Sequence, residues 1–299
     1  MKRPIDFNVE RIEAVDMIGN ELVSRRNLMS PYVWLRGDGT YAMLVRAVPR
    51  LGECGDTGTI WFATSTDGLC FAANDRPVLS PGPEPDDIGG CEDPTPVFQK
   101  DGSVVIYYTG VDATQSHGEM LYAVGPSIDA LVKKGVAMPN TPSQGNIKEA
   151  TVDQTKTGGW RMFFEFARSE ASLVGLAVSD DIAGPWTDER DPFAPRRNSW
   201  DTWHLSTGPL LTSDKNMPVM FYNGATQDAR WRIGWVAFDA EYTQVVDRCI
   251  EPLITPPPAL ERSATDIAFA ASVVEVSDEI WLYYSLSDTH LYRAAIRRS

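Results

Sequence analysis

A unit of about sixty residues recurs five times along the chain, and this recurrence narrows the choice of fold more than any other property of the sequence. Each copy opens with a short apolar strand, turns at a cluster of Gly, Asp, Ser or Lys, and returns as an aromatic-rich strand. The copies occupy residues 32–47, 94–110, 149–167, 207–225 and 270–288. A fixed period of this kind is typical of propellers and solenoids.

A further alternating, strand-like segment follows each hairpin, so we expect about four antiparallel strands per unit. This pattern predicts an all-β fold, a five-bladed β-propeller. The five second strands align at Leu44, Tyr107, Phe163, Phe221 and Leu282. Five units account for the chain from about residue 27 onward, and residues 1–299 are therefore predicted to form a single catalytic domain. A β-sandwich contains similar hairpins but gives no reason for five copies.

Charge and composition exclude several classes of function. The 27 Lys and Arg residues against 41 Asp and Glu residues leave a formal charge of −14, which argues against a nucleic-acid partner. Hydrophobic residues make up 43% of the chain, enough for a compact core. We expect no membrane partner, because no stretch approaches the roughly 18 apolar residues that a spanning helix needs. The first twenty residues lack the apolar core of a signal peptide.

Cysteine and histidine usage points to a reduced protein without a metal centre. The four cysteines show no C-x-x-C spacing and are interpreted as thiols, so the cytoplasm is the expected compartment. The three histidines are too scattered for a zinc signature. Neither a phosphate-binding P-loop nor a dinucleotide fingerprint occurs, and we expect no cofactor. The oligomeric state stays open, a homo-oligomer included.

Polar residues just before the first strand of each unit are expected to lie close together. In a propeller these first strands line a central channel, and the loops leading into them meet at one mouth. The positions hold Asn27 and Ser30, Glu92 and Asp93, Lys148 and Glu149, Trp203 and His204, and Asp266. Carboxylates gathered in a channel desolvate and repel one another, so at least one should keep its proton near neutral pH. Glycoside cleavage needs such a set, with one acid for the leaving oxygen and one base or nucleophile opposite.

Each of these carboxylates also has a structural interpretation. Asp93 precedes a proline and could belong to a turn, Glu149 could pair with Lys148, and Asp266 could cap a loop. Their coincidence at the same place in three units favours a shared catalytic site.

Two arginines and several aromatic residues are candidates for substrate binding. Arg46 and Arg168 end the second strands of two units, where a guanidinium could bind a planar anion or sugar hydroxyls. Ion pairs with the channel carboxylates are the alternative. Trp203 could stack on a sugar face, whereas most aromatic residues on blade strands should pack between blades.

The residues described so far resemble glycoside hydrolase family 130, a family of mannoside phosphorylases and mannosidases with five-bladed propellers. Residues 90–94 resemble its G-x-E-D-P-R motif, with Thr95 in place of the arginine. Residues 200–209 resemble its W-E and K-I-G-x-G-x-P segment. Residues 266–271 and 283–289, with Tyr284 and Asp288, resemble its closing N-V-V-F-P-x-G and Y-Y-G-A-A-D-T signature.

The resemblance implies roles for several residues. Asp93 takes the place of the family's proton donor, which acts through a substrate hydroxyl. In phosphorylase members, phosphate attacks the anomeric carbon with inversion and is held by arginines, a lysine and a histidine. Arg46 and Arg168 match two of these cations, but His204 replaces the lysine and Asn223 replaces the histidine. Losing two cationic ligands weakens a site for a dianion.

We therefore predict an inverting glycosidase that acts on short β-linked mannosides or related oligosaccharides. Asp93 is the expected acid, with Glu149 or Asp266 as the base that activates water. The expected substrate-binding residues are Arg46, Glu92, Lys148, Arg168, Trp203, His204, Asn223, Tyr284 and Asp288. One alternative is a phosphorylase of the same substrates that uses inorganic phosphate, with a protonated His204 replacing the lysine. A second alternative is a sugar-binding propeller without catalysis.

Overall fold

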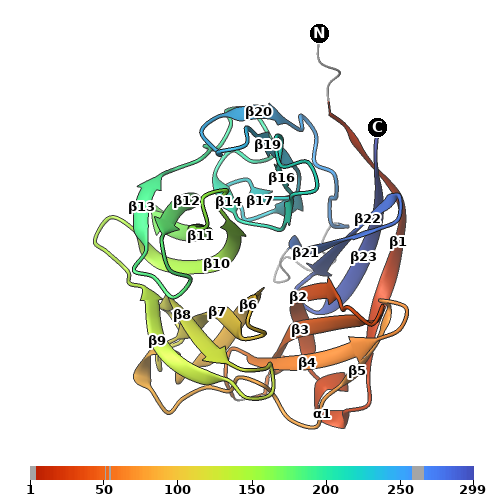
Figure 1. The fold of residues 1–299 in the computed structure, drawn as a ribbon, viewed down its shortest axis with the longest axis vertical. Helices are drawn as coiled ribbons and strands as arrows, with labels where there is room; N and C mark the ends of the chain where they lie inside the picture. Colours follow the sequence, from red (N-terminus) through yellow and green to blue (C-terminus); the bar gives the residue numbers. More distant parts are fainter. Residues whose placement is uncertain (1–4, 51, 54, 258–265) are drawn as a thin grey trace.

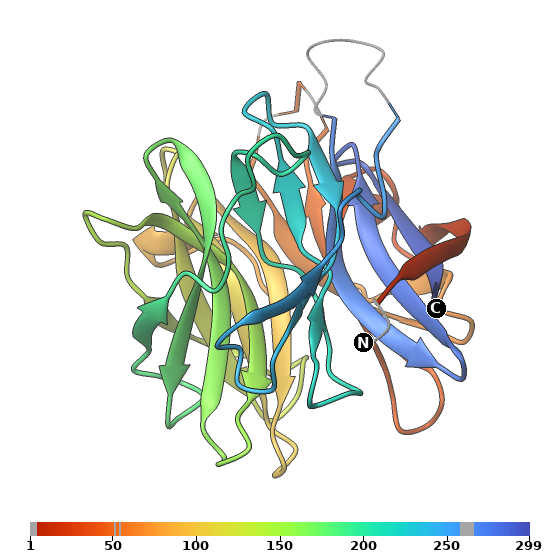
Figure 2. The ribbon, with the colours of Figure 1, turned by 90° about the horizontal axis from the view of Figure 1, so that it is seen from above.

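The computed structural model describes residues 5–50, 52–53, 55–257 and 266–299. The chain is mostly β, and several of its sheets contain four antiparallel strands. Figure 1 shows these sheets arranged in a ring, and Figure 2 shows them from the side. This arrangement is consistent with the expected five-bladed propeller.

The sheets follow the five units of the sequence, and we number them in chain order. Unit 1 contains β2 (Asn27–Leu35), β3 (Tyr41–Val48), β4 (Thr59–Ser65) and β5 (Cys70–Ala73). Unit 2 contains β6 (Gly90–Phe98), β7 (Val104–Val111), β8 (Gly118–Gly125) and β9 (Val132–Met138). Unit 3 contains β10 (Gly145–Gln154), β11 (Trp160–Arg168), β12 (Ala171–Ser179) and β13 (Thr187–Arg190).

Unit 4 is divided into two small sheets. The first contains β14 (His204–Ser206), β17 (Asn223–Ala225) and β18 (Trp231–Ile233). The second contains β15 (Leu210–Leu211), β16 (Val219–Met220), β19 (Val236–Phe238) and β20 (Val245–Arg248). The first strand of the unit is thus interrupted between residues 206 and 210, a segment that includes Pro209.

The first strand of the chain completes the last sheet. Unit 5 contains β21 (Ala268–Val276), β22 (Glu279–Leu286) and β23 (His290–Arg298), and β1 (Phe7–Ile18) adds to it by antiparallel pairing with β23. The end of β1 then pairs in parallel with β5 of unit 1. The sequence analysis left the residues before 27 outside the units. The two short helices are α1 (Glu21–Ser24) and the 3₁₀ turn η1 (Pro85–Asp87).

The aligned positions of the second strands all lie in the core. The side chains of Leu44, Tyr107, Phe163, Phe221 and Leu282 are all fully buried. The period of the sequence therefore marks the same layer in every unit.

The first strands of four units share a bulge. The pairing of first and second strands shifts between Met29 and Tyr32 in β2, and between Glu92 and Thr95 in β6. Equivalent shifts occur in β10 and β21. Within the bulges Ser30, Asp93 and Glu149 have φ values of 52°, 50° and 55°. A bulge re-aims the side chain that it carries, so the three residues occupy one equivalent position, the bulge position.

Side-chain hydrogen bonds join the bulges of successive units. Thr95 Oγ1 donates to the Ala150 carbonyl at 2.7 Å, and Thr151 Oγ1 donates to the Gly208 carbonyl at 3.0 Å. Ser272 Oγ donates to the Pro31 carbonyl at 2.7 Å, which joins unit 5 to unit 1. We call these hydroxyl contacts the clamps. They show that Thr207 and Ala270 hold the bulge position in units 4 and 5.

Candidate functional site

Asp93 lies at the bulge position of unit 2 and is buried, with 7% of its surface exposed. Ser30 Oγ, at the same position of unit 1, donates a hydrogen bond of 2.6 Å to Asp93 Oδ1. Arg46 Nη1 on β3 lies 3.5 Å from the same oxygen. Both donors hold the Asp93 carboxyl group in place.

Arg46 is fixed by its neighbours as well as by Asp93. Its Nε and Nη2 atoms donate to the Thr57 carbonyl at 3.0 and 2.8 Å, and Nη2 also lies 2.5 Å from Glu92 Oε1. Burial raises the pKa of Glu92, and the nearby Arg46 opposes that rise. Arg46 is therefore held beside Asp93 in a fixed orientation.

Glu149, at the bulge position of unit 3, is in direct contact with Asp93. A side-chain interaction with the Asp93 carboxyl group is among the causes that raise the pKa of Glu149, and two carboxyl groups that share a hydrogen bond need a proton on one of them. Burial raises the pKa of Glu149 well above its usual value, and the negative charge of Asp93 raises it further. The Glu149 carbonyl accepts a hydrogen bond of 2.5 Å from Thr207 Oγ1 in unit 4.

The contact disfavours Glu149 as the hydrolytic base, one of the two candidates of the sequence analysis. An inverting hydrolase needs its two carboxyl groups roughly 6.5 to 9.5 Å apart, because a water molecule stands between them. Glu149 touches the expected acid and leaves no such gap.

Lys148 and Asp288 also belong to the site. Lys148 Nζ lies 3.4 Å from Glu165 Oε1 on β11, and Glu165 raises the pKa of Lys148. Asp288, in the turn between β22 and β23, interacts electrostatically with Arg46, Asp93 and Lys148. Burial raises the pKa of Asp288.

Acids outnumber cations in this cluster. The carboxyl groups belong to Glu92, Asp93, Glu149, Glu165 and Asp288, and the cations are Arg46 and Lys148. Burial raises the pKa values of Glu92, Glu149 and Asp288 within this cluster.

His204 and Trp203 lie beside this cluster. His204 feels the charges of Glu165 and Lys148, but burial lowers its pKa and favours the neutral ring. Its Nδ1 accepts a hydrogen bond of 3.1 Å from the Ser172 amide. Trp203 Nε1 donates to the Glu170 carbonyl at 3.2 Å. These contacts do not favour the protonated His204 that was expected to replace a phosphate-binding lysine.

Two expected substrate-binding residues lie in the interior instead. Asn223 is fully buried, and its side chain bonds the Thr207 carbonyl at 2.6 Å and the Ala270 amide at 2.7 Å. It therefore joins unit 4 to unit 5. Tyr284 is 2% exposed and stacks on Tyr292 with ring centres 5.8 Å apart. Packing within and between sheets accounts for both residues, so their assignment to substrate binding is corrected.

Arg168 is also placed differently from Arg46. Its side chain is 42% exposed, pairs with Asp191, and lies over the Phe166 ring at 5.0 Å. Arg46 is the third residue from the end of its strand, whereas Arg168 is the last residue of β11, where the chain turns into β12. The structure thus gives no support to Arg168 as a partner of Arg46 in anion binding.

Asp266 does not hold the bulge position that the sequence analysis assigned to it. That position belongs to Ala270, four residues further along the chain. Asp266 Oδ2 lies 3.6 Å from Arg230 Nε in the loop before β18, and the Asp266 carbonyl accepts from the Trp231 amide at 2.9 Å.

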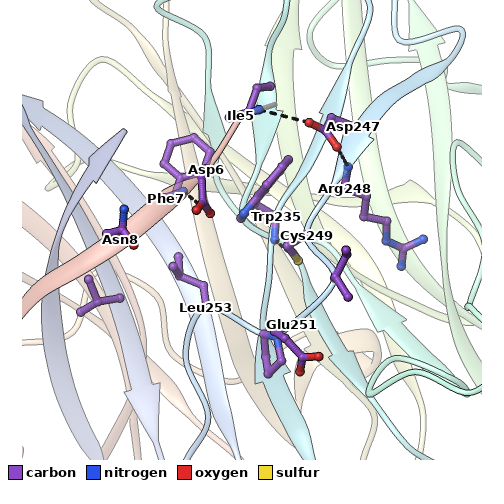
Figure 3. Close-up of a pocket in the computed structure, with 13 residues that line it drawn as sticks. Ile5, Asp6, Phe7, Asn8, Trp235, Asp247, Arg248, Cys249, Glu251 and Leu253 are labelled. Atoms are coloured by element: carbon purple, nitrogen blue, oxygen red, sulfur yellow. Dashed lines mark hydrogen bonds between the residues drawn. The ribbon is translucent and has the colours of Figure 1, made fainter. Parts of the chain in front are cut away.

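A large cavity elsewhere gathers none of these groups. Figure 3 shows a cavity of about 540 Å³ whose lining includes Phe7, Trp235, Asp247, Arg248 and Leu253. Within the described residues, no group of three or more His, Cys, Asp or Glu side chains could hold a metal ion. No helix in the described part of the chain is long and apolar enough to span a membrane.

The sequence analysis missed contributors that act through the backbone or through another side chain. Glu165, buried at 3% exposure, pairs with Lys148, and Ser30 holds Asp93. Glu165 lies on the aromatic-rich strand β11 with its side chain facing the interior. A single acidic residue in such a strand is a sequence signal that could have identified it. The hydroxyls of Thr95 and Thr207 carry no local signal, because their acceptors lie in other units.

Comparison with known proteins agrees with this geometry. The family model of glycoside hydrolase family 130, described as β-1,4-mannooligosaccharide phosphorylase, matches residues 36–298. A 1,2-β-oligomannan phosphorylase of Thermoanaerobacter sp. (strain X514) is 26% identical over 257 residues, which cover 84% of this chain and 79% of the relative.

Solved structures share the fold at lower identity. The complex of the Listeria innocua β-1,2-mannobiose phosphorylase with β-1,2-mannobiose has a TM-score of 0.74 at 16% identity, over 96% of this chain and 91% of that chain. A structure from work on family 130 hydrolases that target β-1,2-mannosidic linkages in Candida mannan has a TM-score of 0.74 at 24% identity, over 90% and 84% of the two chains. Because the family model covers most of the sequence, the chain belongs to glycoside hydrolase family 130, whose enzymes are phosphorylases or hydrolases of β-mannosides.

Proposed function

We propose that this protein is a β-mannoside phosphorylase with a five-bladed propeller fold and Asp93 as its proton donor. The substrates would be short β-linked mannosides and inorganic phosphate, and the products would be mannose 1-phosphate and a shortened sugar. The sequence analysis had placed hydrolysis first. The curated relatives that match this chain are named as phosphorylases, and they favour phosphorolysis over hydrolysis.

The contact between Asp93 and Glu149 carries the proposal. Water is a weak nucleophile and needs a base, and Glu149 stands too close to the acid to serve as one. Phosphate already carries negative charge, so it can attack the anomeric carbon without a base.

Arg46 and Lys148 are the cations available to hold the incoming phosphate. Arg46 presents a planar donor fork fixed by Thr57, and Lys148 presents a point charge. Glu92 and Glu165 neutralise part of this positive charge. Phosphate binding should therefore be weaker than in a site with more cations.

Hydrolysis is the second candidate, and the excess of carboxyl groups around Asp93 favours it. A dianion is repelled by such a cluster, whereas water is not. The buried Asn223 also takes no part in a phosphate site. Under this alternative Asp266 is the remaining candidate for the base.

Product analysis separates the two functions. The protein is incubated with β-1,2- or β-1,4-mannobiose, with and without inorganic phosphate, and the products are identified. Mannose 1-phosphate that forms only with phosphate supports the proposal. Free mannose at a rate independent of phosphate would establish the hydrolase instead. No turnover of either disaccharide, with sugar bound equally by wild type and Asp93→Asn, would indicate a binding protein.

A further inference from the structure

We propose that Glu149 is a positioning residue that stores and returns the catalytic proton of Asp93, so that the two carboxyl groups act as one acid. The inference rests on the proposed role of Asp93 as proton donor. It assigns to Glu149 a role other than that of base or nucleophile.

The backbone holds the two carboxyl groups in contact. Asp93 and Glu149 occupy the bulge positions of neighbouring units, both with positive φ. Thr95, two residues after Asp93, donates to the carbonyl of Ala150, the residue after Glu149. Thr207 holds the carbonyl of Glu149 itself. Each acid is therefore fixed by the neighbouring strands, and their contact does not depend on flexible side chains alone.

The partners of the two acids divide their roles. Asp93 Oδ1 accepts hydrogen bonds from Ser30 and Arg46, so this oxygen is used as an acceptor. The Glu149 side chain faces Asp93 and feels the opposed charges of Lys148 and Glu165. The proton of the resting pair therefore belongs mainly to Glu149.

Two further charged groups, Glu92 on β6 and Lys148 on β10, lie on the strands of the pair itself. The others come from three further elements: Arg46 on β3, Glu165 on β11 and Asp288 in the turn after β22. His204 on β14 reaches this network through Lys148 and Glu165. Since the acids exceed the cations, removing a proton from the pair adds negative charge where it is already in excess.

The proton then follows a balanced route. It shifts along the hydrogen bond from Glu149 to Asp93, and the Asp93 O–H bond breaks as the proton passes to the sugar and reaches the leaving oxygen. Phosphate forms its bond to the anomeric carbon as the glycosidic bond breaks. The proton that the attacking hydrogen phosphate gives up restores the pair.

Replacing Glu149 by glutamine tests this role. Glu149→Gln keeps the size and the hydrogen bond but carries no exchangeable acid proton. Turnover of mannobiose with phosphate at pH 7 should fall by about a hundredfold, a typical contribution of general acid catalysis. The alkaline limb of the kcat/KM profile should move to lower pH, because Asp93 must then be protonated without its neighbour. Turnover of an aryl β-mannoside with a nitrophenol leaving group should fall only a few-fold, because this leaving group needs little protonation.

Glu149→Asp is the matched control, because it keeps an ionisable group but withdraws it by one methylene from Asp93. Its alkaline limb should lie between those of wild type and Glu149→Gln. Equal losses on mannobiose and the aryl mannoside, with an unchanged pH profile, would overturn the inference and indicate a role in sugar binding.

Infrared difference spectra test the stored proton without turnover. The difference between wild type and Glu149→Gln at pH 7 should contain the band of one protonated carboxyl group. The absence of that band would overturn the inference even if the enzyme is a phosphorylase. Conversely, wild type that forms no mannose 1-phosphate would refute the proposed function while the spectrum still reports on the pair.

Discussion

The bulge position is acidic in units 2 and 3 but neutral in units 4 and 5. Asp93 and Glu149 occupy it in the first pair, and Thr207 and Ala270 occupy it in the second. The clamps are similar in both halves, so the backbone device is shared and the side chain alone differs. The proposed catalytic side chains are thus concentrated in neighbouring units, while units 4 and 5 supply backbone contacts at the same position.

Replacing Asp93, the acid of unit 2, should have the largest effect on activity. Asp93→Asn removes the proton donor while keeping shape, and turnover of mannobiose should fall by about a thousandfold. Steady-state kinetics of the purified variant measure the loss. Asp101→Asn, in the exposed turn between β6 and β7 of the same unit, is the control and should keep wild-type activity. A loss below tenfold for Asp93→Asn would show that another group donates the proton.

A second comparison contrasts the two arginines at the ends of second strands. Arg46→Lys keeps the charge but loses the fork that contacts Thr57, Glu92 and Asp93. Loss of one or two charge-assisted hydrogen bonds should lower kcat/KM for phosphate by about 10- to 100-fold. Arg168→Lys, at an exposed ion pair, should change it less than about twofold. Equal effects of the two substitutions, measured with phosphate as the varied substrate, would restore Arg168 to the site.

The smallest effect should come from the clamps. Thr95→Val leaves the Ala150 carbonyl without its donor, at a cost of about 1–3 kcal/mol in the free energy of unfolding. Ser272→Ala does the same to the Pro31 carbonyl between units 5 and 1. Both should lower the melting temperature, but Thr95→Val alone should also reduce kcat several-fold, because it loosens Glu149 beside Asp93. Thr95→Ser keeps the hydroxyl and is the control.

Thermal melts and kinetics of the three variants decide this last point. If Thr95→Val and Ser272→Ala reduce kcat equally, the clamps act on overall stability, and the special link between Thr95 and Glu149 is wrong.

Periodicity predicted the layers of the fold because every unit buries the same positions. The five residues that align by period are all in the core: Leu44, Tyr107, Phe163, Phe221 and Leu282. The closing strand β1 was missed because its partner β23 lies at the other end of the chain, and long-range pairing leaves no local signal. The first strand of unit 4 is interrupted, and the sequence analysis placed its channel-facing position at Trp203 and His204. In the structure Thr207 holds that position.

The candidate site was predicted where its position followed directly from the repeat. Asp93 and Glu149 lie at the bulges of the first strands β6 and β10, and the structure brings them together with Arg46, Lys148 and Asp288. Arg168, Asn223, Tyr284 and Asp266 lie apart from this cluster, because a residue type does not reveal side-chain direction. Asn223 and Tyr284 point into the interior, whereas Arg168 lies at an exposed turn.

The pairing of Phe7 with Arg298 has a consequence for how the chain is made. A strand formed at the start of synthesis must wait for the last strand before the final sheet can close. Until then both β1 and the open edge of unit 1 expose backbone groups that invite pairing with other chains. The entropy cost of closing a loop rises only slowly with its length, so the long separation of β1 and β23 adds little to it. Contacts between residues so far apart in the sequence nevertheless slow folding. The interval between synthesis of β22 and docking of β23 is therefore when the nascent protein is most exposed to aggregation.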